Sequence, residues 1–246
     1  MKTSFVFVWL LIAFTSNAQT KFLHAGKIEF ERKINVHRQF DVEENDSWYK
    51  EYVSKLQKFH TTYFDLYFQE GKTVYKPGRE SDDNRKNVWG IGPSKDNIVH
   101  TDTEKKETKS LKNVFEETFL LEDSSRKLEW RMSDEVRTIA GFDCRKAVAK
   151  ICDSVYIVAF YTDEITVSGG PESIYGLPGM ILGLAVPRLY TTWFATKVEL
   201  IEPTAKDFAT RSKGKKTTEK DLLKTLNSSL DDWGKTGQRY IWWVML

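Results

Sequence analysis

Apolar and polar residues alternate along much of this chain. In the segment 28–36 every even position is apolar except Arg32, and the odd positions are mostly charged. The same alternation recurs in the segments 64–68 and 128–132. A period of two is typical of half-buried antiparallel strands, which place one face on a core and the other in water. We therefore predict a fold built mainly from antiparallel β-strands, with Arg32 interrupting an apolar face.

Three further segments are predicted to be strands. Residues 155–162 are apolar on both faces of an extended chain, which indicates a strand in the centre of a sheet. Residues 191–202 form another strand, and residues 180–186 are typical of a buried strand interrupted by Gly183. Aromatic residues make up 13% of the chain, which agrees with a β-rich fold.

Helical spacing of apolar residues occurs in two places. It is present over residues 47–60 and is more regular over residues 218–233. Thr218 followed by Asp221 resembles a helix cap, and Gly234 is expected to end this second helix. The sequence therefore predicts one or two helices beside the strands.

The first 19 residues have a different character. Lys2 precedes an apolar run over residues 5–14, and small polar residues follow it. This pattern is typical of a secretory signal peptide, and the apolar run is shorter than the roughly 20 residues that span a bilayer. We therefore predict export and a single domain over residues 20–246. Loss of Lys2 lowers the net charge from +2 to +1, which does not favour nucleic-acid binding.

The two cysteines are not expected to form a disulfide. Cys144 and Cys152 lie eight residues apart in a segment that is predicted to be extended. An extended chain separates them by roughly 26 Å, whereas a disulfide tolerates only about 7 Å between α-carbons. We predict two separate thiols, with Cys144 partly buried as a small core residue and Cys152 near a turn.

The sequence contains no recognisable catalytic or metal-binding motif. The four histidines are scattered, and no pair has the spacing of a zinc motif, so we predict neither a metal nor a cofactor. Asp163 and Glu164 are adjacent and would point to opposite faces of a strand, which disfavours cooperation as a pair of acids. Glu172 lies in a glycine-rich stretch without an evident partner. Catalytic residues are therefore not predicted.

The glycine-rich stretch 168–186, SGGPESIYGLPGMILGLAV, is the least ordinary part of the chain. Proline followed by glycine at positions 178–179 predicts a type II turn over Leu177–Met180, with a positive φ at Gly179. Gly170 and Pro171 supply a second bend just before it. The apolar loop between these two corners is either a plug for one end of the β-structure or a preorganised recognition surface.

The motifs around this stretch resemble those of the GLPGLI family of exported Bacteroidota proteins. The matching residues are Gly141, Cys144, Lys146, Ala147, Tyr161, Thr162, Ile165, Gly170, Pro171, Gly176, Leu177, Pro178, Gly179 and Ile181. Met180 replaces a leucine of the family pattern, Phe160 stands where tryptophan is common, and Thr166 replaces a frequent proline. The specific motifs span residues 139–186.

This resemblance implies a fold and a cellular setting. The family is similar to the bowl-like N-terminal domain of certain bacterial peptide:N-glycosidases, which implies a strongly curved antiparallel sheet, a bowl or half-barrel. Many members are encoded beside TonB-dependent outer-membrane transporters, which implies a role in uptake in the cell envelope. We expect the protein in the periplasm or on the periplasmic face of the outer membrane. The candidate binding loop comprises Tyr161, Gly170, Pro171, Tyr175, Gly176, Leu177, Pro178, Gly179, Met180 and Ile181.

We expect a non-catalytic binding or accessory protein that assists a TonB-dependent transporter and takes a peptide or glycan ligand. Tryptophans and tyrosines are abundant without catalytic groups, and aromatic faces suit such ligands. Two alternatives stay open at this point. One is a hydrolase whose acids, such as Glu164 or Glu172, come from separate strands, and the other is a carrier of lipid or lipoprotein.

Overall fold

The structure is a computed structural model that describes residues 22–40, 47–81, 93–124, 126–152, 154–209 and 213–246. The predicted signal segment 1–19 lies outside the described residues. The strands are β1 (Ala25–Asn35), β2 (Phe59–Gln69), β3 (Lys72–Pro77), β4 (Ile98–Asp102), β5 (Glu107–Val114), β6 (Glu117–Ser124), β7 (Arg131–Ile139), β8 (Phe142–Ile151), β9 (Val155–Thr162), β10 (Met180–Val186), β11 (Thr191–Glu199) and β12 (Lys215–Thr217). The α-helices are α1 (Val36–Gln39), α2 (Ser47–Lys55), α3 (Ala205–Phe208), α4 (Glu219–Ser229) and α5 (Gly234–Val244). Short 3₁₀ helices are η1 (Pro93–Asp96), η2 (Pro187–Leu189) and η3 (Asp231–Trp233).

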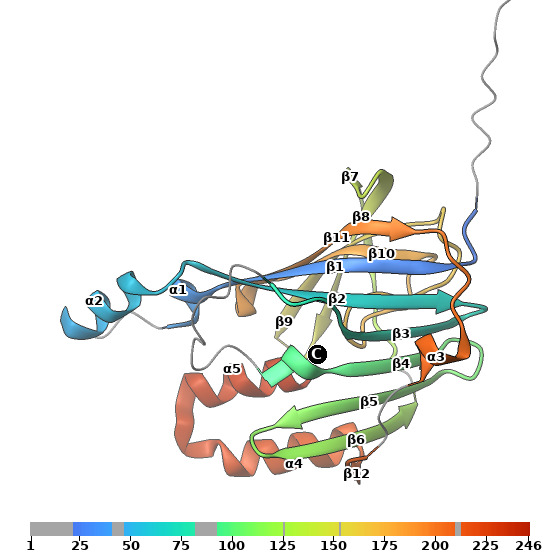
Figure 1. The fold of residues 1–246 in the computed structure, drawn as a ribbon. Coiled ribbons are helices and arrows are strands. Elements are labelled where there is room, and N and C mark those ends of the chain that lie inside the picture. Colours follow the sequence, from blue (N-terminus) through green and yellow to red (C-terminus); the bar gives the residue numbers. More distant parts are fainter. Residues whose placement is uncertain (1–21, 41–46, 82–92, 125, 153, 210–212) are drawn as a thin grey trace, which may run out of the picture.

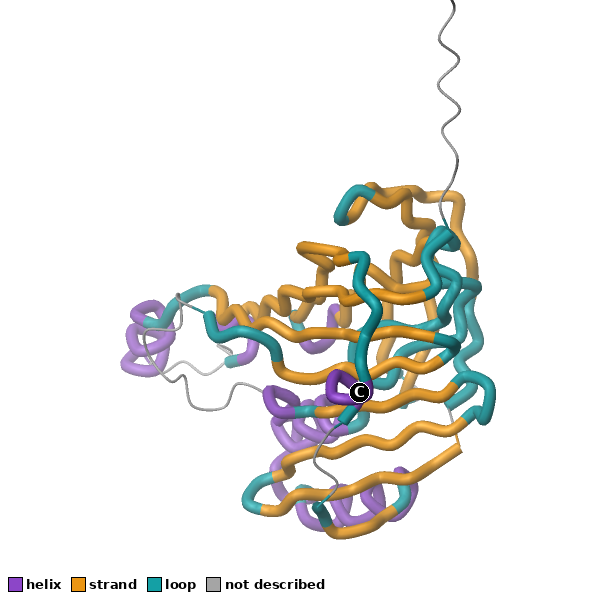
Figure 2. Tube along the Cα trace, turned by 45° about the vertical axis from the view of Figure 1, so that its right-hand side comes forward, coloured by secondary structure: helices purple, strands orange, loops and turns teal. Residues whose placement is uncertain are grey.

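All twelve described strands form one sheet in the order β12-β6-β5-β4-β3-β2-β1-β11-β10-β9-β8-β7. Neighbouring strands are antiparallel except β12 and β6, which are parallel. Strands β12 and β7 are the two edges, so the sheet is not closed. Figures 1 and 2 show the sheet curling strongly round a core, with α4 and α5 beside β5 and β6. The predicted mainly-β, curved antiparallel fold with few helices is confirmed.

Strand β1 lies in the middle of the sheet and joins distant parts of the chain. It pairs with β2 on one side and with β11 on the other, where Ile28 lies opposite Val198. Ile28, Phe30 and Ile34 are fully buried, as the alternation predicts. The buried strands on either side of β1 therefore share one core.

Arg32 does not interrupt the buried face of β1, because its side chain is fully buried with the apolar residues. Its Nη1 donates to Ser94 Oγ at 2.6 Å, and its Nε donates to Thr62 Oγ1 at 2.9 Å. The guanidinium also lies over the rings of Phe64 and Trp243, at 4.9 and 5.8 Å from the two centroids. These contacts replace part of the hydration that a buried charge loses.

The helices differ from the predicted pattern at their ends. The predicted helix over 47–60 ends at Lys55, because Phe59 already belongs to β2. Helix α4 begins after the predicted cap, where Thr218 Oγ1 accepts a hydrogen bond from Asp221 N at 3.1 Å. Gly234 does not end this helix, which stops at Ser229, and it instead begins α5 with a φ of +52°.

Helices α4 and α5 cover the face of β5 and β6 that points towards the core. Their leucines and the end of α5 pack with inward residues of these strands in a second apolar cluster. That cluster consists of Val114, Phe119, Leu121, Leu222, Leu226, Leu230, Ile241, Val244 and Met245.

The segment 128–132 is only partly a strand, since β7 begins at Arg131. No helix within the described residues is long and apolar enough to cross a membrane.

Candidate functional site

The loop singled out in the sequence lies mostly inside the protein. Seven of its ten predicted residues are buried: Tyr161, Gly170, Pro171, Leu177, Gly179, Met180 and Ile181. Tyr175 is half-buried, and Gly176 and Pro178 are exposed. The structure thus brings these residues together at one corner of the core but leaves only three of them with exposed surface. Recognition by this loop remains a prediction.

The turn at Pro178 and Gly179 is not the predicted type II turn. Gly179 N donates to Leu177 O at 2.8 Å, which closes a three-residue γ-turn centred on Pro178. Gly179 has the predicted positive φ, but its value of +138° differs from the roughly +80° of a type II turn. The reason is close packing, because a Cβ built on Gly179 would lie 2.0 Å from Thr162 O. The chain bends more tightly here in order to lie against the end of β9.

The rest of the loop is fixed by hydrogen bonds from separate parts of the chain. Trp130 Nε1 donates to Tyr175 O at 3.2 Å, and Gly176 N donates to Ser168 Oγ at 3.0 Å. The main-chain N of Ile181 donates to Gly169 O at 2.8 Å. These bonds hold the exposed part of the loop in one conformation.

Glu172, at the centre of this loop, belongs to a buried polar cluster that sequence reasoning missed. Its side chain is 2% exposed, and its backbone has a φ of +57°, which is uncommon for a residue with a side chain. Asn97 Nδ2 donates to Glu172 Oε2 at 2.8 Å, whereas Oε1 has no partner within the described residues. Burial raises the pKa of this carboxyl group, and the hydrogen bond from Asn97 opposes that change.

Arg32 and Lys112 place two positive charges in the same buried region. Lys112 is 4% exposed, and its Nζ donates to Val244 O at 2.7 Å, near the C-terminal end of α5. A cation at this end of a helix is favourable because the last carbonyl groups carry partial negative charge. Burial lowers the pKa of Lys112 to about 8, although Glu172 acts in the opposite direction. The cluster therefore ties the glycine-rich loop and α5 to the inner face of the sheet.

The lowered pKa of Lys112 makes the free energy of unfolding depend on pH. Its pKa is about 8 in the folded protein and near its ordinary value of 10.5 in the unfolded chain. Between these values the unfolded state binds more protons, so Lys112 raises the free energy of unfolding as the pH increases. We expect the free energy of unfolding of the wild type, relative to that of Lys112→Met, to increase from pH 8 to pH 10. Urea unfolding of both proteins at several pH values tests this, and a constant difference would contradict it.

The opposite face of strands β3 to β6 carries a pocket of about 640 Å³. Side chains alternate along a strand, so Leu111 points away from the face on which Lys112 reaches α5. Leu111 and Leu120 are directly opposite each other on β5 and β6, and both line the pocket. Ile98 of β4 extends this apolar floor. The pocket therefore lies on the outer side of the sheet, apart from the glycine-rich loop.

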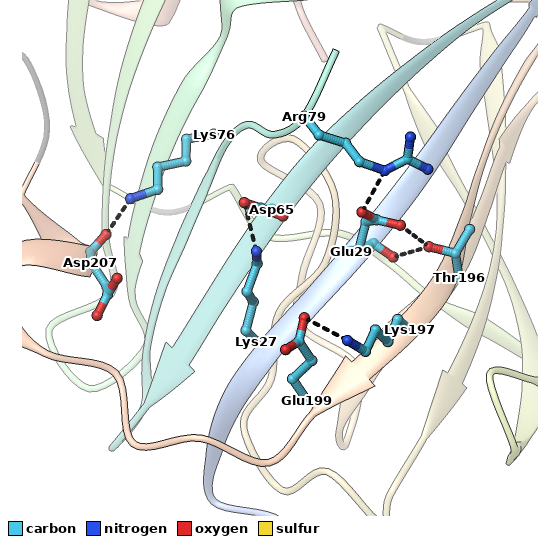
Figure 3. A network of polar contacts seen from close by, with 9 residues as sticks. All are labelled: Lys27, Glu29, Asp65, Lys76, Arg79, Thr196, Lys197, Glu199 and Asp207. Atoms are coloured by element: carbon cyan, nitrogen blue, oxygen red, sulfur yellow. Dashed lines mark hydrogen bonds and ion pairs between the residues drawn. The ribbon is translucent and has the colours of Figure 1, made fainter. Parts of the chain in front are cut away.

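Helix α3 and the residues before it form one wall of the pocket. Pro203, Ala205 and Phe208 line it from this side. The helix is held by a capping box in which Thr204 N donates to Asp207 Oδ2 at 2.7 Å. Lys76 Nζ, on β3, donates to Asp207 O at 2.7 Å, as Figure 3 shows. The wall is therefore fastened to the strand beside the pocket.

A network of ion pairs continues from Lys76 across β2, β1 and β11 (Figure 3). Lys27 Nζ lies 2.9 Å from Asp65 Oδ2, and Arg79 Nε lies 3.0 Å from Glu29 Oε2. Thr196 Oγ1 donates to the other oxygen of Glu29 at 2.6 Å. These charges satisfy one another across neighbouring strands, which stabilises an exposed sheet face. None of these residues lines the pocket, so the network stabilises the sheet beside it.

The titratable groups of the pocket do not form an evident acid–base pair. His100 lies on β4 between Val74 and Lys109, and burial together with nearby Lys76 and Lys109 lowers its pKa, so the ring is neutral at pH 7. Neither Glu164 nor Glu172 lines the pocket. Among the described residues, no group of three or more His, Cys, Asp or Glu side chains is placed to hold a metal.

Both cysteines are free thiols, which agrees with the geometric argument from the sequence. Cys144 is fully buried in β8, deeper than expected, and burial raises the pKa of its thiol to about 12. A thiol in that state is a poor nucleophile at neutral pH. Cys152 is half-buried in the turn after β8, as predicted.

Residues 149–183 match the family described as "Protein of unknown function (Porph_ging)". The match runs from the end of β8 into β10 and includes the glycine-rich loop. No protein with a curated description matches the sequence. The family match over residues 149–183 covers a short part of the chain. It agrees with the coarser expectation of a β-rich family of the Bacteroidota type.

Two solved structures of PNGF-II are similar to this fold. The structure in space group C2 has a TM-score of 0.52 and 16% sequence identity, with 89% of this chain and 32% of that chain covered. The structure in space group P21 has a TM-score of 0.52 and 17% identity, with 81% and 33% covered. This chain therefore spans about a third of the PNGF-II chain. At this identity the likeness shows the fold alone.

Proposed function

We propose that this protein is an exported, non-catalytic binding protein of the cell envelope that holds a small ligand in the pocket between β3–β6 and α3. The pocket carries the proposal, because its volume of about 640 Å³ falls within the roughly 300–1,000 Å³ of typical ligand sites. One end of its floor is apolar and the other end carries charged side chains, a combination typical of sites that bury a ligand and orient it. A short peptide or a glycan fragment fits such a site.

The cellular setting is part of the same proposal. The segment 1–19 has the pattern of a signal peptide, and the motifs resemble those of the GLPGLI family, which favours the periplasm or the periplasmic face of the outer membrane. We propose that the protein assists a TonB-dependent transporter. Gly176 and Pro178 are exposed and Tyr175 is half-buried, so these three residues of the loop are its proposed contact with that transporter.

A lipid carrier remains the second candidate function. Ile98, Leu111 and Leu120 give the pocket an apolar end on the outer face of the sheet, where an acyl chain could pack. The carrier proposal requires a bound lipid after gentle extraction. Native mass spectrometry of protein purified from its own envelope separates a lipid from a peptide or glycan by mass.

The pocket is tested by filling it from α3. Ala205 is exposed on α3 and lines the pocket, so Ala205→Trp places an indole in the ligand space without disturbing the core. Lys206→Trp is the matched control, because Lys206 is the next residue and does not line the pocket. We expect ligands recovered with the wild type to be lost, by at least about tenfold, from Ala205→Trp alone.

The measurement is native mass spectrometry of the three proteins, each expressed in the native envelope and purified under the same conditions. Circular dichroism checks that all three remain folded. Equal recovery of the same molecules with the wild type and Ala205→Trp would show that they bind elsewhere and would overturn the pocket as the binding site.

A further inference from the structure

The floor of the pocket changes from apolar to charged in three rows that run across the strands. Ile98, Leu111 and Leu120 form one row, in which each residue lies opposite the next. The middle row consists of Val74, His100, Lys109 and Glu122. Lys72, Asp102 and Glu107 form the last row, nearest the strand turns. A ligand that follows this gradient has an apolar end and a charged end.

The last row places two carboxylates directly opposite each other. Asp102 on β4 pairs with Glu107 on β5, and both side chains line the pocket. Like charges at directly opposed positions of antiparallel strands are destabilising. Lys72 lies opposite Asp102 on the other side, and Asp102 Oδ1 accepts a hydrogen bond from Lys105 N at 3.0 Å. One negative charge of this row therefore remains uncompensated by the row itself.

The other charged residues of the pocket confine the excess negative charge to this last row. Glu122 lies 3.4 Å from Lys109 and 3.3 Å from Lys216, so two positive charges share one carboxylate and the middle row is not acidic. His100 is neutral at pH 7, as described above. Glu70 and Lys105, from the two adjoining turns, also line the pocket and have opposite charges. The excess negative charge of the pocket is thus at the end formed by Asp102 and Glu107.

We propose that the natural ligand of this pocket is amphipathic, with an organic ammonium group between Asp102 and Glu107 and an apolar body along Ile98, Leu111 and Leu120. This inference rests on the proposed function, because it requires the pocket to be the binding site. An organic cation fits better than a metal ion, because two carboxylates provide few ligands and the neighbouring side chains include the cations of Lys72 and Lys109. A bound ammonium relieves the repulsion between the two carboxylates, which links binding to stability.

Three compounds with the same chain test the sign of the charge. Octylammonium, octanoate and octanol are titrated calorimetrically against the wild type, Glu107→Gln, Glu104→Gln and Ala205→Trp. We expect the wild type to bind octylammonium about three- to tenfold more tightly than octanol, and octanoate more weakly than both. Glu107→Gln is expected to remove the preference for octylammonium without changing the affinity for octanol. Glu104→Gln is the control, because Glu104 is exposed nearby and does not line the pocket.

Glu107→Gln weakens the binding of octylammonium but is expected to stabilise the ligand-free protein. Removing one of two opposed carboxylates should raise the midpoint of thermal unfolding by about 1–3 °C in Glu107→Gln, whereas Glu104→Gln leaves it unchanged. A gain in stability together with a loss of octylammonium affinity is the signature of a ligand that neutralises this pair. A residue with only a structural role would lose stability on substitution.

The outcomes separate this inference from the proposed function. If octanol and octanoate bind as tightly as octylammonium and Ala205→Trp abolishes all three, the pocket binds ligands but the proposed ammonium group is wrong. If none of the three compounds binds the wild type, the amphipathic ligand is wrong, and recovery of envelope molecules then decides the proposed function independently. Binding that Ala205→Trp leaves unchanged contradicts both.

Discussion

Gly179→Val is expected to lower the midpoint of thermal unfolding by more than about 10 °C, a loss of more than about 4 kcal/mol in the free energy of unfolding. A Cβ at this position would lie 2.0 Å from Thr162 O and 2.8 Å from Thr162 C, both of which are main-chain atoms. Main-chain atoms in a paired strand cannot move aside as the end of a flexible side chain can. The positive φ of +138° adds to the cost for a β-branched residue.

Gly141→Val separates these two causes. Gly141 also has a positive φ, of +87°, but a Cβ there meets no atom within 4 Å. Its substitution therefore carries the backbone cost alone, about 1–3 kcal/mol. Circular dichroism melting of both variants measures the difference. Equal losses would show that backbone conformation alone makes glycine necessary at position 179, and that the contact with Thr162 is not tight.

Glu172→Gln is expected to cost about 3–5 kcal/mol at pH 7, because the Coulombic attraction of Arg32 and Lys112 favours an ionised carboxylate that glutamine cannot provide. Glutamine has nearly the same shape and retains an oxygen that can accept from Asn97. The loss therefore measures charge compensation and not packing. Urea unfolding of the wild type and the variant gives the difference.

A double-mutant cycle with Lys112→Met tests the cause. Lys112→Met removes one of the two buried cations and leaves Val244 O without its donor. If Glu172 compensates Lys112, the double variant loses less stability than the sum of the two single variants, by about 1–3 kcal/mol. Strict additivity would mean that Glu172 acts through Arg32 alone.

Much of the strand pattern could be predicted because it depends on local alternation. Ile28, Phe30 and Ile34 follow the pleat of β1, and residues 180–186 are the buried strand β10 that the sequence indicates. The period of two directly encodes which side chains face the core. The cap at Thr218 is local in the same way, so it was predicted to the residue.

Features that depend on contacts between distant segments could not be predicted. Arg32 is read from its neighbours as a charge on an apolar face, and its burial is explained by contacts with distant segments, such as those with Ser94 and Trp243. The burial of Glu172 likewise could not be predicted, because its hydrogen-bonding partner Asn97 lies on a different part of the chain. Helix α5 was missed because Gly234 has the usual chemistry of a helix end, but here adopts a positive φ at a helix start.

The candidate site shows the same limit. Glycine and proline at 178–179 identified a constrained corner, but the turn type depends on how closely Thr162 approaches it. The pocket depends on the registers that place Lys72, Asp102 and Glu107 in one row, and no local pattern gives a register between strands. Residues 102–107, DTEKKE, are rich in charges of both signs, and this is the signal that the sequence offers for the charged end of the pocket.

The pairing of β1 with β11 also sets when the chain can fold. Ile28 and Val198 are neighbours in the sheet although 170 positions separate them in the sequence. Contacts of such long sequence separation slow folding, because a large loop must close before they form. A nascent chain that has been synthesised only as far as β10 has a central strand with one of its two partners missing. Its apolar face lacks a complete core until β11, in the last quarter of the chain, has been synthesised. We therefore expect the growing chain to become compact only after most of it has been made.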